Sequence, residues 1–148
     1  MRRLRPDKAS AINGTCCDKD GDSMAEGRPQ TILVIDDDFA NRRVLQLLLK
    51  RNGYVAVLAG DGCAGLRLAR ETQPDLVLLD FFMPGEDGFE VLAQLKADPA
   101  LRDIPVVIFT VLVREESERQ ALELGAAAYV TKPFDIDEVI TCIRRILP

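Results

Sequence analysis

The stretch TILVIDDDFANRR, Thr31–Arg43, sets an apolar run directly against three adjacent carboxylates. The run 31–35 predicts a buried β-strand, and the periodicity after the acids predicts an amphipathic helix. Asp36, Asp37 and Asp38 lie between the two. Like charges about 4 Å apart repel by roughly 4 kcal/mol at an effective dielectric of about 20. Either the acids point into water as a helix cap, or a cation lies among them.

The same alternation of elements continues to the end of the chain. Apolar runs typical of strands occupy 31–35, 54–59, 75–80, 105–110 and 128–131, and helical patterns occupy 39–53, 61–74, 87–100, 114–126 and 135–148. Five strands alternating with five helices predict a parallel sheet with helices on both faces. The strand runs are almost continuously apolar, which predicts burial on both faces. We therefore expect a three-layer, doubly wound α/β fold.

The expected helices have recognisable ends and apolar faces. Gly53 and Gly125 are expected to end the first and fourth helices, and Pro74 the second. Acidic residues open the fourth helix, where the helix dipole favours negative charge. The apolar residues expected on shared faces are Val44, Leu45, Leu48 and Leu49 in the first helix, and Phe89, Leu92 and Leu95 in the third.

Composition limits the classes of function. The chain has 148 residues, is 47% hydrophobic and 29% charged, and has a net charge of −5 with a pI of about 4.8. This acidity argues against a nucleic-acid partner held through its phosphates. No apolar run approaches the roughly 18 residues of a membrane span. The chain has no histidine, and its four cysteines have no CxxC spacing, so neither a zinc site nor histidine catalysis is expected.

Residues 1–28 differ from the rest of the chain because they are polar and lack periodicity. We expect a flexible N-terminal arm at 1–28 and one folded domain at 29–148. The start is basic, but no apolar stretch follows it, so we expect no export and a cytoplasmic protein with reduced thiols. The arm segment 18–23, DKDGDS, resembles a calcium loop but lacks the glycine and glutamate that an EF-hand needs.

Polar residues end four of the five expected strands. Asp36 and Asp37 follow the first strand, Asp80 the third, Thr110 ends the fourth, and Lys132 follows the fifth. Each has a local explanation in turn, capping or surface chemistry. Functional residues of such sheets collect at the carboxyl ends of the strands, however, and all five residues share that edge. Oxygen ligands without His or Cys suit Mg²⁺ or Mn²⁺, with the lysine as a point charge for a phosphate.

The chain from Thr31 to Leu147 resembles a response-regulator receiver domain, the phosphoacceptor module of bacterial two-component signalling and phosphorelays. The resemblance is carried by VIDDD at 34–38, DLVLLDFFMPGEDG at 75–88, PVVIFT at 105–110 and AYVTKPF at 128–134. The ordered set is much more specific than any one of these motifs. It implies a flavodoxin-like sheet with strand order 2-1-3-4-5.

The resemblance also implies roles for individual residues. Asp80 would be the nucleophile that accepts a phosphoryl group from the phosphohistidine of a sensor histidine kinase or histidine phosphotransfer protein. Mg²⁺ would be held by Asp37, by Asp36 largely through water, by Asp80 and by the backbone carbonyl of Phe82. Lys132 and Thr110 would bind phosphoryl oxygens. Asp38 is expected to cap the first helix instead.

The resemblance implies a switch and a readout surface as well. Tyr129 would move between exposed and buried positions, and a protein target would bind the face made by the helix 114–126, the strand 128–131 and the helix 135–148. A half-buried strand aromatic is the ordinary alternative for Tyr129. Pro133 is expected to follow a cis peptide bond.

Three residues around the expected site depart from the family pattern. Val111 follows Thr110 where receivers usually have a small residue, and Phe82 and Leu112 are apolar where polar residues are frequent. Bulky apolar groups over an acyl phosphate should hinder the attacking water. We therefore expect slow autodephosphorylation, and a restricted coupling between Thr110 and Tyr129.

The chain is expected to be a single-domain regulator, monomeric or weakly dimeric, that catalyses only its own phosphorylation and dephosphorylation. Other functions are also open. A phosphorelay shuttle, or a receiver cut from a longer protein, is also compatible with the sequence. A degenerate receiver acting as a constitutive interaction module would lack some of the five site residues. A haloacid-dehalogenase-type phosphohydrolase would need D-x-D-x-[TV], whereas DDDFA has Ala40 in the last position.

Overall fold

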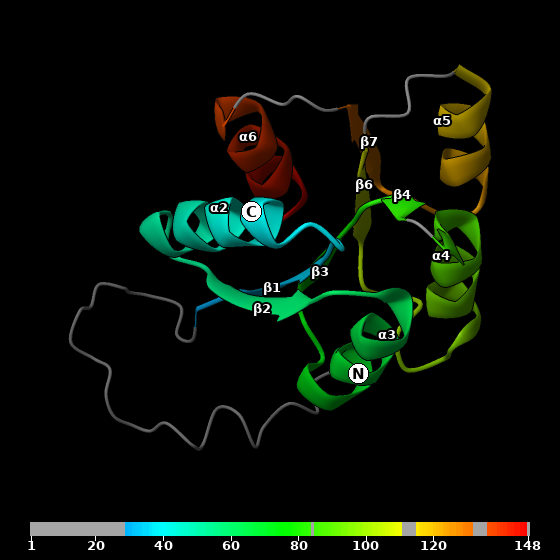
Figure 1. Cartoon of the computed structure of the whole chain (residues 1–148), viewed down its shortest axis with the longest axis horizontal. Helices are drawn as coiled ribbons and strands as arrows, with labels where there is room; N and C mark the ends of the chain where they lie inside the picture. The colour runs from blue at the N-terminus through cyan, green and yellow to red at the C-terminus, as the bar shows by residue number, and fades with distance from the viewer. Residues whose placement is uncertain (1–28, 84, 111–114, 132–135, 148) are drawn as a thin grey trace.

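The computed structural model describes residues 29–83, 85–110, 115–131 and 136–147. Five parallel strands form the main sheet in the order β2-β1-β3-β6-β7 (Figure 1). The strands are β1 (Thr31–Ile35), β2 (Val55–Ala59), β3 (Leu76–Leu79), β6 (Val106–Thr110) and β7 (Ala128–Thr131). This is the predicted 2-1-3-4-5 order. The expected arm at 1–28 lies outside the described residues.

Helices connect the strands and cover both faces of the sheet. They are α2 (Phe39–Arg51), α3 (Gly62–Thr72), α4 (Gly88–Ala97), α5 (Glu115–Glu123) and α6 (Ile136–Ile146). Figure 1 shows α2 and α6 on one face and α3, α4 and α5 on the other. Each predicted helix is present. None of the helices in the described ranges has the length and hydrophobicity of a membrane span.

The sheet separates two apolar cores because successive strand residues point to opposite faces. In β1, Leu33 and Ile35 belong to the core under α3 and α4, whereas Ile32 and Val34 belong to the core under α2 and α6. All four are fully buried. A strand with both faces buried needs the continuous apolar run seen at 31–35.

Burial on both faces does not extend to the edge strand β2, so that part of the prediction was wrong. Its Val55 is 44% exposed, and only Ala59 is fully buried. A strand at the edge of a sheet has a neighbour on one side only, and the helices reach over it incompletely. Val44 was also misplaced, because it is 50% exposed on α2 while Leu45 and its neighbours fill the core.

A short hairpin follows β3 and was not predicted. Its strands are β4 (Phe82–Met83) and β5 (Glu86–Asp87), which pair antiparallel. Gly85 has a φ of +80°, a left-handed conformation that glycine adopts without strain. The hairpin carries the chain from the end of β3 into α4, whose N-cap is Asp87.

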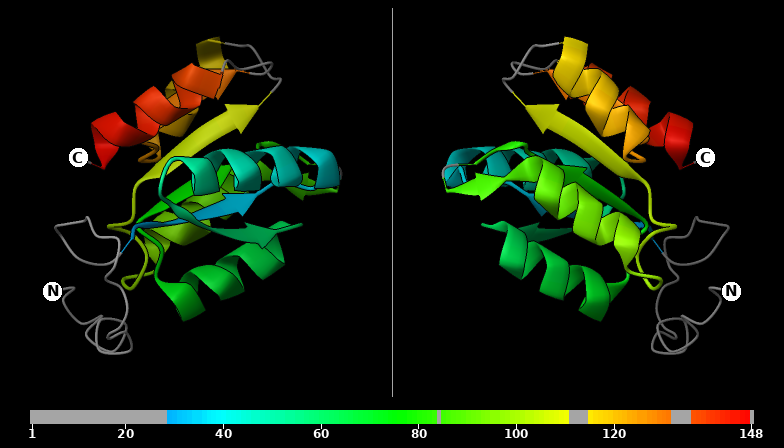
Figure 2. Two further views of the ribbon diagram at one scale, coloured as in Figure 1. Left: turned by 90° about the vertical axis from the view of Figure 1, so that its left-hand side faces the viewer. Right: turned by 90° about the vertical axis from the view of Figure 1, so that its right-hand side faces the viewer.

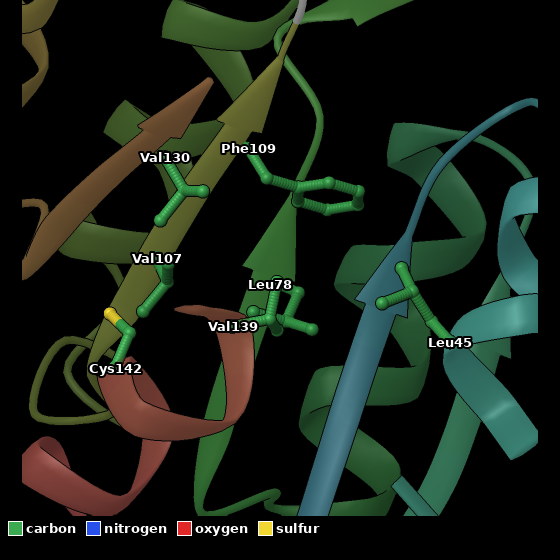
Figure 3. A pocket seen from close by; sticks show the side chains of 7 residues that line it. All are labelled: Leu45, Leu78, Val107, Phe109, Val130, Val139 and Cys142. Carbon is green, nitrogen blue, oxygen red and sulfur yellow. The ribbon is translucent and has the colours of Figure 1, made fainter. Parts of the chain in front are cut away.

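A small pocket between α2, α6 and the sheet is lined by hydrocarbon side chains and one thiol (Figure 3). Its volume is about 10 Å³, which is hardly enough for one water molecule. Burial raises the pKa of the Cys142 thiol, one of the lining groups, which favours its neutral form. We interpret the pocket as a packing gap rather than a ligand site. Its lining residues are Leu45, Leu78, Val107, Phe109, Val130, Val139 and Cys142.

Candidate functional site

Three carboxylates meet at the carboxyl edge of the sheet. Asp36 and Asp37 follow β1, and Asp80 follows β3. One carboxylate oxygen from each lies within 4.8 Å of the others. Asp36 is fully buried and Asp80 is 3% exposed, whereas Asp37 is exposed. The cluster therefore opens to solvent on the side of Asp37.

Parallel strand geometry explains why residues so far apart in sequence meet. The register pairs Ile35 of β1 with Leu79 of β3, so the residues that follow both strands leave the sheet at the same edge. Figure 2 shows the arrows of β1 (blue) and β6 (yellow) pointing to the same end of the molecule. In open parallel sheets, this end is the usual place for ligands.

The turn after β1 is held by hydrogen bonds that backbone N–H groups donate to a carbonyl and to two carboxylates. The N–H of Asp36 donates to the carbonyl of Ala59 at 3.1 Å, and the N–H of Asp38 donates to Oδ1 of Asp36 at 3.0 Å. Oδ1 of Asp38 accepts a hydrogen bond of 2.9 Å from the N–H of Ala40 and caps α2. The prediction that Asp38 is a helix cap is confirmed. The first two acids belong to the cluster and the third belongs to the helix.

Thr110 ends β6 at the same edge and is fully buried. It pairs in register with Thr131, the last residue of β7. The predicted site residues Lys132, Val111 and Leu112 and the expected cis bond before Pro133 lie outside the described residues. Phe82 opens β4, two residues after Asp80, and its side chain is not among those described.

An aromatic group connects Asp80 to the edge strand β7. Phe81 is 6% exposed, and its ring centroid lies 4.5 Å from that of Phe89 and 6.4 Å from that of Tyr129. The Phe81 and Tyr129 rings meet edge to face at 84°, a favourable arrangement for aromatic pairs. A Cβ on Gly88 would lie 2.4 Å from Cδ1 of Phe81, so glycine is needed there.

Tyr129 is half-buried on β7. Desolvation raises the pKa of its phenol, and the negative charge of Glu118 on α5 raises it further. Both causes favour the neutral hydroxyl. The structure therefore places this tyrosine between the core and the surface, at the junction of β7 and α5.

The carboxylate cluster fits a hard divalent cation. Its three ligand candidates supply only oxygen atoms, which Mg²⁺ and Mn²⁺ prefer, and two of them are almost removed from water. Because a buried carboxylate needs a compensating partner, a cation among these oxygens would lower the cost of bringing them together. The residues present therefore match the predicted ligand type.

Comparison with known proteins decides the family. The family model of the response regulator receiver domain matches residues 32–144. The chain belongs to this family. Receiver domains are signalling modules and bind Mg²⁺ through acidic residues, of which this receiver has a cluster in the expected place.

Relatives of this receiver include RpaA, a DNA-binding dual master transcriptional regulator of Synechocystis sp. (strain ATCC 27184 / PCC 6803 / Kazusa). The two are 40% identical over 116 residues, which is 78% of this chain and 48% of RpaA. The receiver spans about half the length of such curated relatives or less.

Solved structures show the same architecture. The chemotaxis protein CheY4 of Vibrio cholerae superposes on this receiver with a TM-score of 0.77 over 80% of this chain and 99% of CheY4, at 24% identity. The Mn²⁺-bound form of the response regulator Rcp1 gives a TM-score of 0.67 at 31% identity, over 80% of this chain and 91% of Rcp1.

Two residues that contact the candidate site at the carboxyl edge of the sheet were not predicted from the sequence. Arg42 donates a hydrogen bond to the carbonyl of Asp36, and Phe81 packs against Tyr129. In the sequence, Phe81 belongs to an apolar turn, and Arg42 is one of several charged residues on an amphipathic helix. Only the direction of their side chains in the folded chain distinguishes them.

Proposed function

We propose that the chain is a phosphoacceptor regulator in which Asp80 carries the phosphoryl group. A carboxylate oxygen of Asp80 attacks phosphorus, a P–O bond forms, and the P–N bond of a donor phosphohistidine breaks with its electron pair left on the ring nitrogen. Hydrolysis of the acyl phosphate later returns the carboxylate and inorganic phosphate. The observation that carries the proposal is the position of Asp80, nearly buried within 4.8 Å of the Asp36 and Asp37 oxygens.

The other residues at the carboxyl edge of the sheet are proposed to hold the cation and to bind the phosphoryl group. Asp36, Asp37, Asp80 and the carbonyl of Phe82 are proposed to hold Mg²⁺ or Mn²⁺, and Lys132 and Thr110 to bind phosphoryl oxygens. A bound divalent cation neutralises charge that develops on the transferring group. The Mn²⁺ reported for Rcp1, which is 31% identical, supports this choice of cation.

The readout is proposed to pass through Tyr129 to the face formed by α5, β7 and α6. Thr110 and Tyr129 lie on the paired strands β6 and β7, so a movement at the end of β6 reaches β7 through direct contacts. A sensor histidine kinase or histidine phosphotransfer protein would supply the phosphoryl group, and a protein target would bind this face.

The organisation of the whole protein is a separate part of the proposal. We assign 29–148 to the receiver and 1–28 to an N-terminal arm, and we favour action on a separate protein target. RpaA, named as a DNA-binding regulator, is about twice as long as its matched part. An attached output domain and a phosphorelay shuttle are therefore the alternatives. Pull-downs with and without beryllofluoride, a phosphoryl mimic, distinguish a switched target from a phosphotransfer partner.

Phosphorylation itself is tested by Phos-tag electrophoresis after incubation with a histidine-kinase donor and Mg²⁺. The wild-type chain is expected to show a shifted band that EDTA abolishes, and Asp80→Asn to show none. Wild type without a shift would support the degenerate, constitutive module. Turnover of p-nitrophenyl phosphate would instead support the phosphohydrolase.

A further inference from the structure

Arg42 connects the first turn of α2 to the end of β1. Its Nη1 donates a hydrogen bond of 2.6 Å to the backbone carbonyl of Asp36, six residues earlier. The side chain is half-buried, and its guanidinium carbon lies 5.7 Å from the centroid of the Phe39 ring. A charge-assisted hydrogen bond of this length is among the stronger ones in proteins.

The Arg42 guanidinium lies between the ends of β1 and β2. Gly60 follows the last residue of β2, and a Cβ on it would lie 3.2 Å from Nη1 of Arg42. The preceding residue, Ala59, accepts the N–H of Asp36. The absence of a side chain at Gly60 thus leaves the space that the Arg42 guanidinium occupies.

These contacts fix the peptide group that joins Asp36 to Asp37. The Asp36 N–H is bound to Ala59, the Asp36 carbonyl to Arg42, and Oδ1 of Asp36 to the N–H of Asp38. The peptide plane cannot rotate without breaking the Arg42 bond. Asp37 is exposed, so its carboxylate depends on that plane for its direction.

We propose that Arg42 is a positioning residue that orients the Asp36–Asp37 peptide and so keeps the Asp37 carboxylate in place for the divalent cation. The inference rests on the proposed function. A cation beside an acidic site weakens the binding of a second cation if it acts through charge alone. Removal of Arg42 would then raise the affinity for the metal. If Arg42 positions a ligand instead, its removal lowers metal affinity, typically by about 10–100-fold.

Mn²⁺ titration of the full chain shows whether loss of Arg42 raises or lowers the affinity for the cation. Free Mn²⁺ is followed by electron paramagnetic resonance. Arg42→Met is expected to weaken Mn²⁺ binding about tenfold. Arg42→Lys is expected to restore part of that loss, because it retains a donor without the planar fork. Arg43→Met is the matched control and should bind Mn²⁺ like wild type, since Arg43 is exposed and its Nη1 donates a hydrogen bond to Oε1 of Gln46 on the same helix.

The unfolding temperature in EDTA separates positioning from general destabilisation. A folded Arg42→Met chain that binds Mn²⁺ as tightly as wild type, or more tightly, would overturn the inference and leave the proposed function standing. A wild-type chain that binds no Mn²⁺ would overturn both. Should Arg42→Met not fold, Gly60→Val decides in its place. A Cβ at residue 60 would already lie 3.2 Å from Nη1 of Arg42, so the larger branched side chain is expected to displace the guanidinium while its charge is retained. Weaker Mn²⁺ binding by folded Gly60→Val supports the inference, and unchanged binding contradicts it.

Discussion

The backbone N–H of Asp80 donates a hydrogen bond to the carbonyl of Ile35 at 3.0 Å. Ile35 is the residue immediately before the acidic pair, so this bond sets the end of β3 directly beside the end of β1. The distance between the carboxylates is therefore fixed by strand pairing and not by a flexible loop. Such rigid support is what a site with a defined geometry needs.

Divalent cations are expected to stabilise the fold through this cluster. A ligand that binds only the folded state at 100 times its Kd adds about 2.7 kcal/mol to the free energy of unfolding. Asp37→Asn should lose most of this gain, because one of the three carboxylates is removed. Thermal unfolding with Mg²⁺ and with EDTA measures the effect. An equal Mg²⁺ response in Asp37→Asn would show that the negative charge of Asp37 contributes nothing to cation binding.

Asp38 is expected to stabilise α2 and to leave cation binding unaffected. Asp38→Ala removes the hydrogen bond to the N–H of Ala40, and loss of such a cap costs about 1 kcal/mol. Asp38→Asn retains an accepting oxygen and should unfold near the wild-type urea concentration. Both variants should bind Mg²⁺ within about twofold of wild type. A tenfold loss of affinity in Asp38→Asn would assign the third acid to the site.

Gly88→Ala should be strongly destabilising. The new Cβ would lie 2.6 Å from Cα of Phe81, a backbone atom that cannot rotate away, and overpacking typically costs about 1–3 kcal/mol. Gly65→Ala is the comparison, since its closest contact would be a side-chain atom, Cδ1 of Ile35, at 2.5 Å. Urea unfolding should rank Gly88→Ala as the less stable. The reverse order would mean that the segment around Phe81 yields more easily than the Ile35 side chain.

Tyr129 should make stability fall at alkaline pH. Its folded-state pKa is raised above the usual 10.0, so the unfolded chain loses this proton first as the pH rises. Below about pH 9 the phenol is neutral in both states and contributes no pH dependence. Between about pH 9 and pH 11, wild type should therefore lose more of its free energy of unfolding than Tyr129→Phe. Parallel losses in urea titrations of the two chains would contradict this burial effect.

The apolar residues after Thr110 should slow dephosphorylation. Val111→Ala combined with Leu112→Lys is expected to speed hydrolysis of phospho-Asp80 severalfold, because water would reach the acyl phosphate more easily. Loss of the Phos-tag band with time measures the rate. Leu47→Lys is a suitable control, since Leu47 is 54% exposed on α2. If the double variant decays at the wild-type rate, the hypothesis of slow autodephosphorylation is wrong.

Most of the fold follows from local sequence patterns. The run 31–35 forms a strand because it is continuously apolar, and Asp38 caps α2 because its carboxylate reaches the N–H of a residue two positions later. Gly53 and Gly125, which have φ values of +88° and +110°, lie just beyond the ends of α2 and α5, as predicted. Such features depend on residues within a few positions of each other.

The sequence by itself determined the five strands of the main sheet, the five helices, their order along the chain, and the acid, hydroxyl and cationic residues at the carboxyl ends of the strands. Only the tertiary structure decided that Asp36 is buried while Asp37 is exposed, that Arg42 donates a hydrogen bond to the carbonyl between them, and that Phe81 meets Tyr129. Helix caps and apolar periodicity are short-range properties of the chain. Side-chain directions at the site depend instead on strand order and register, which bring together residues from distant segments.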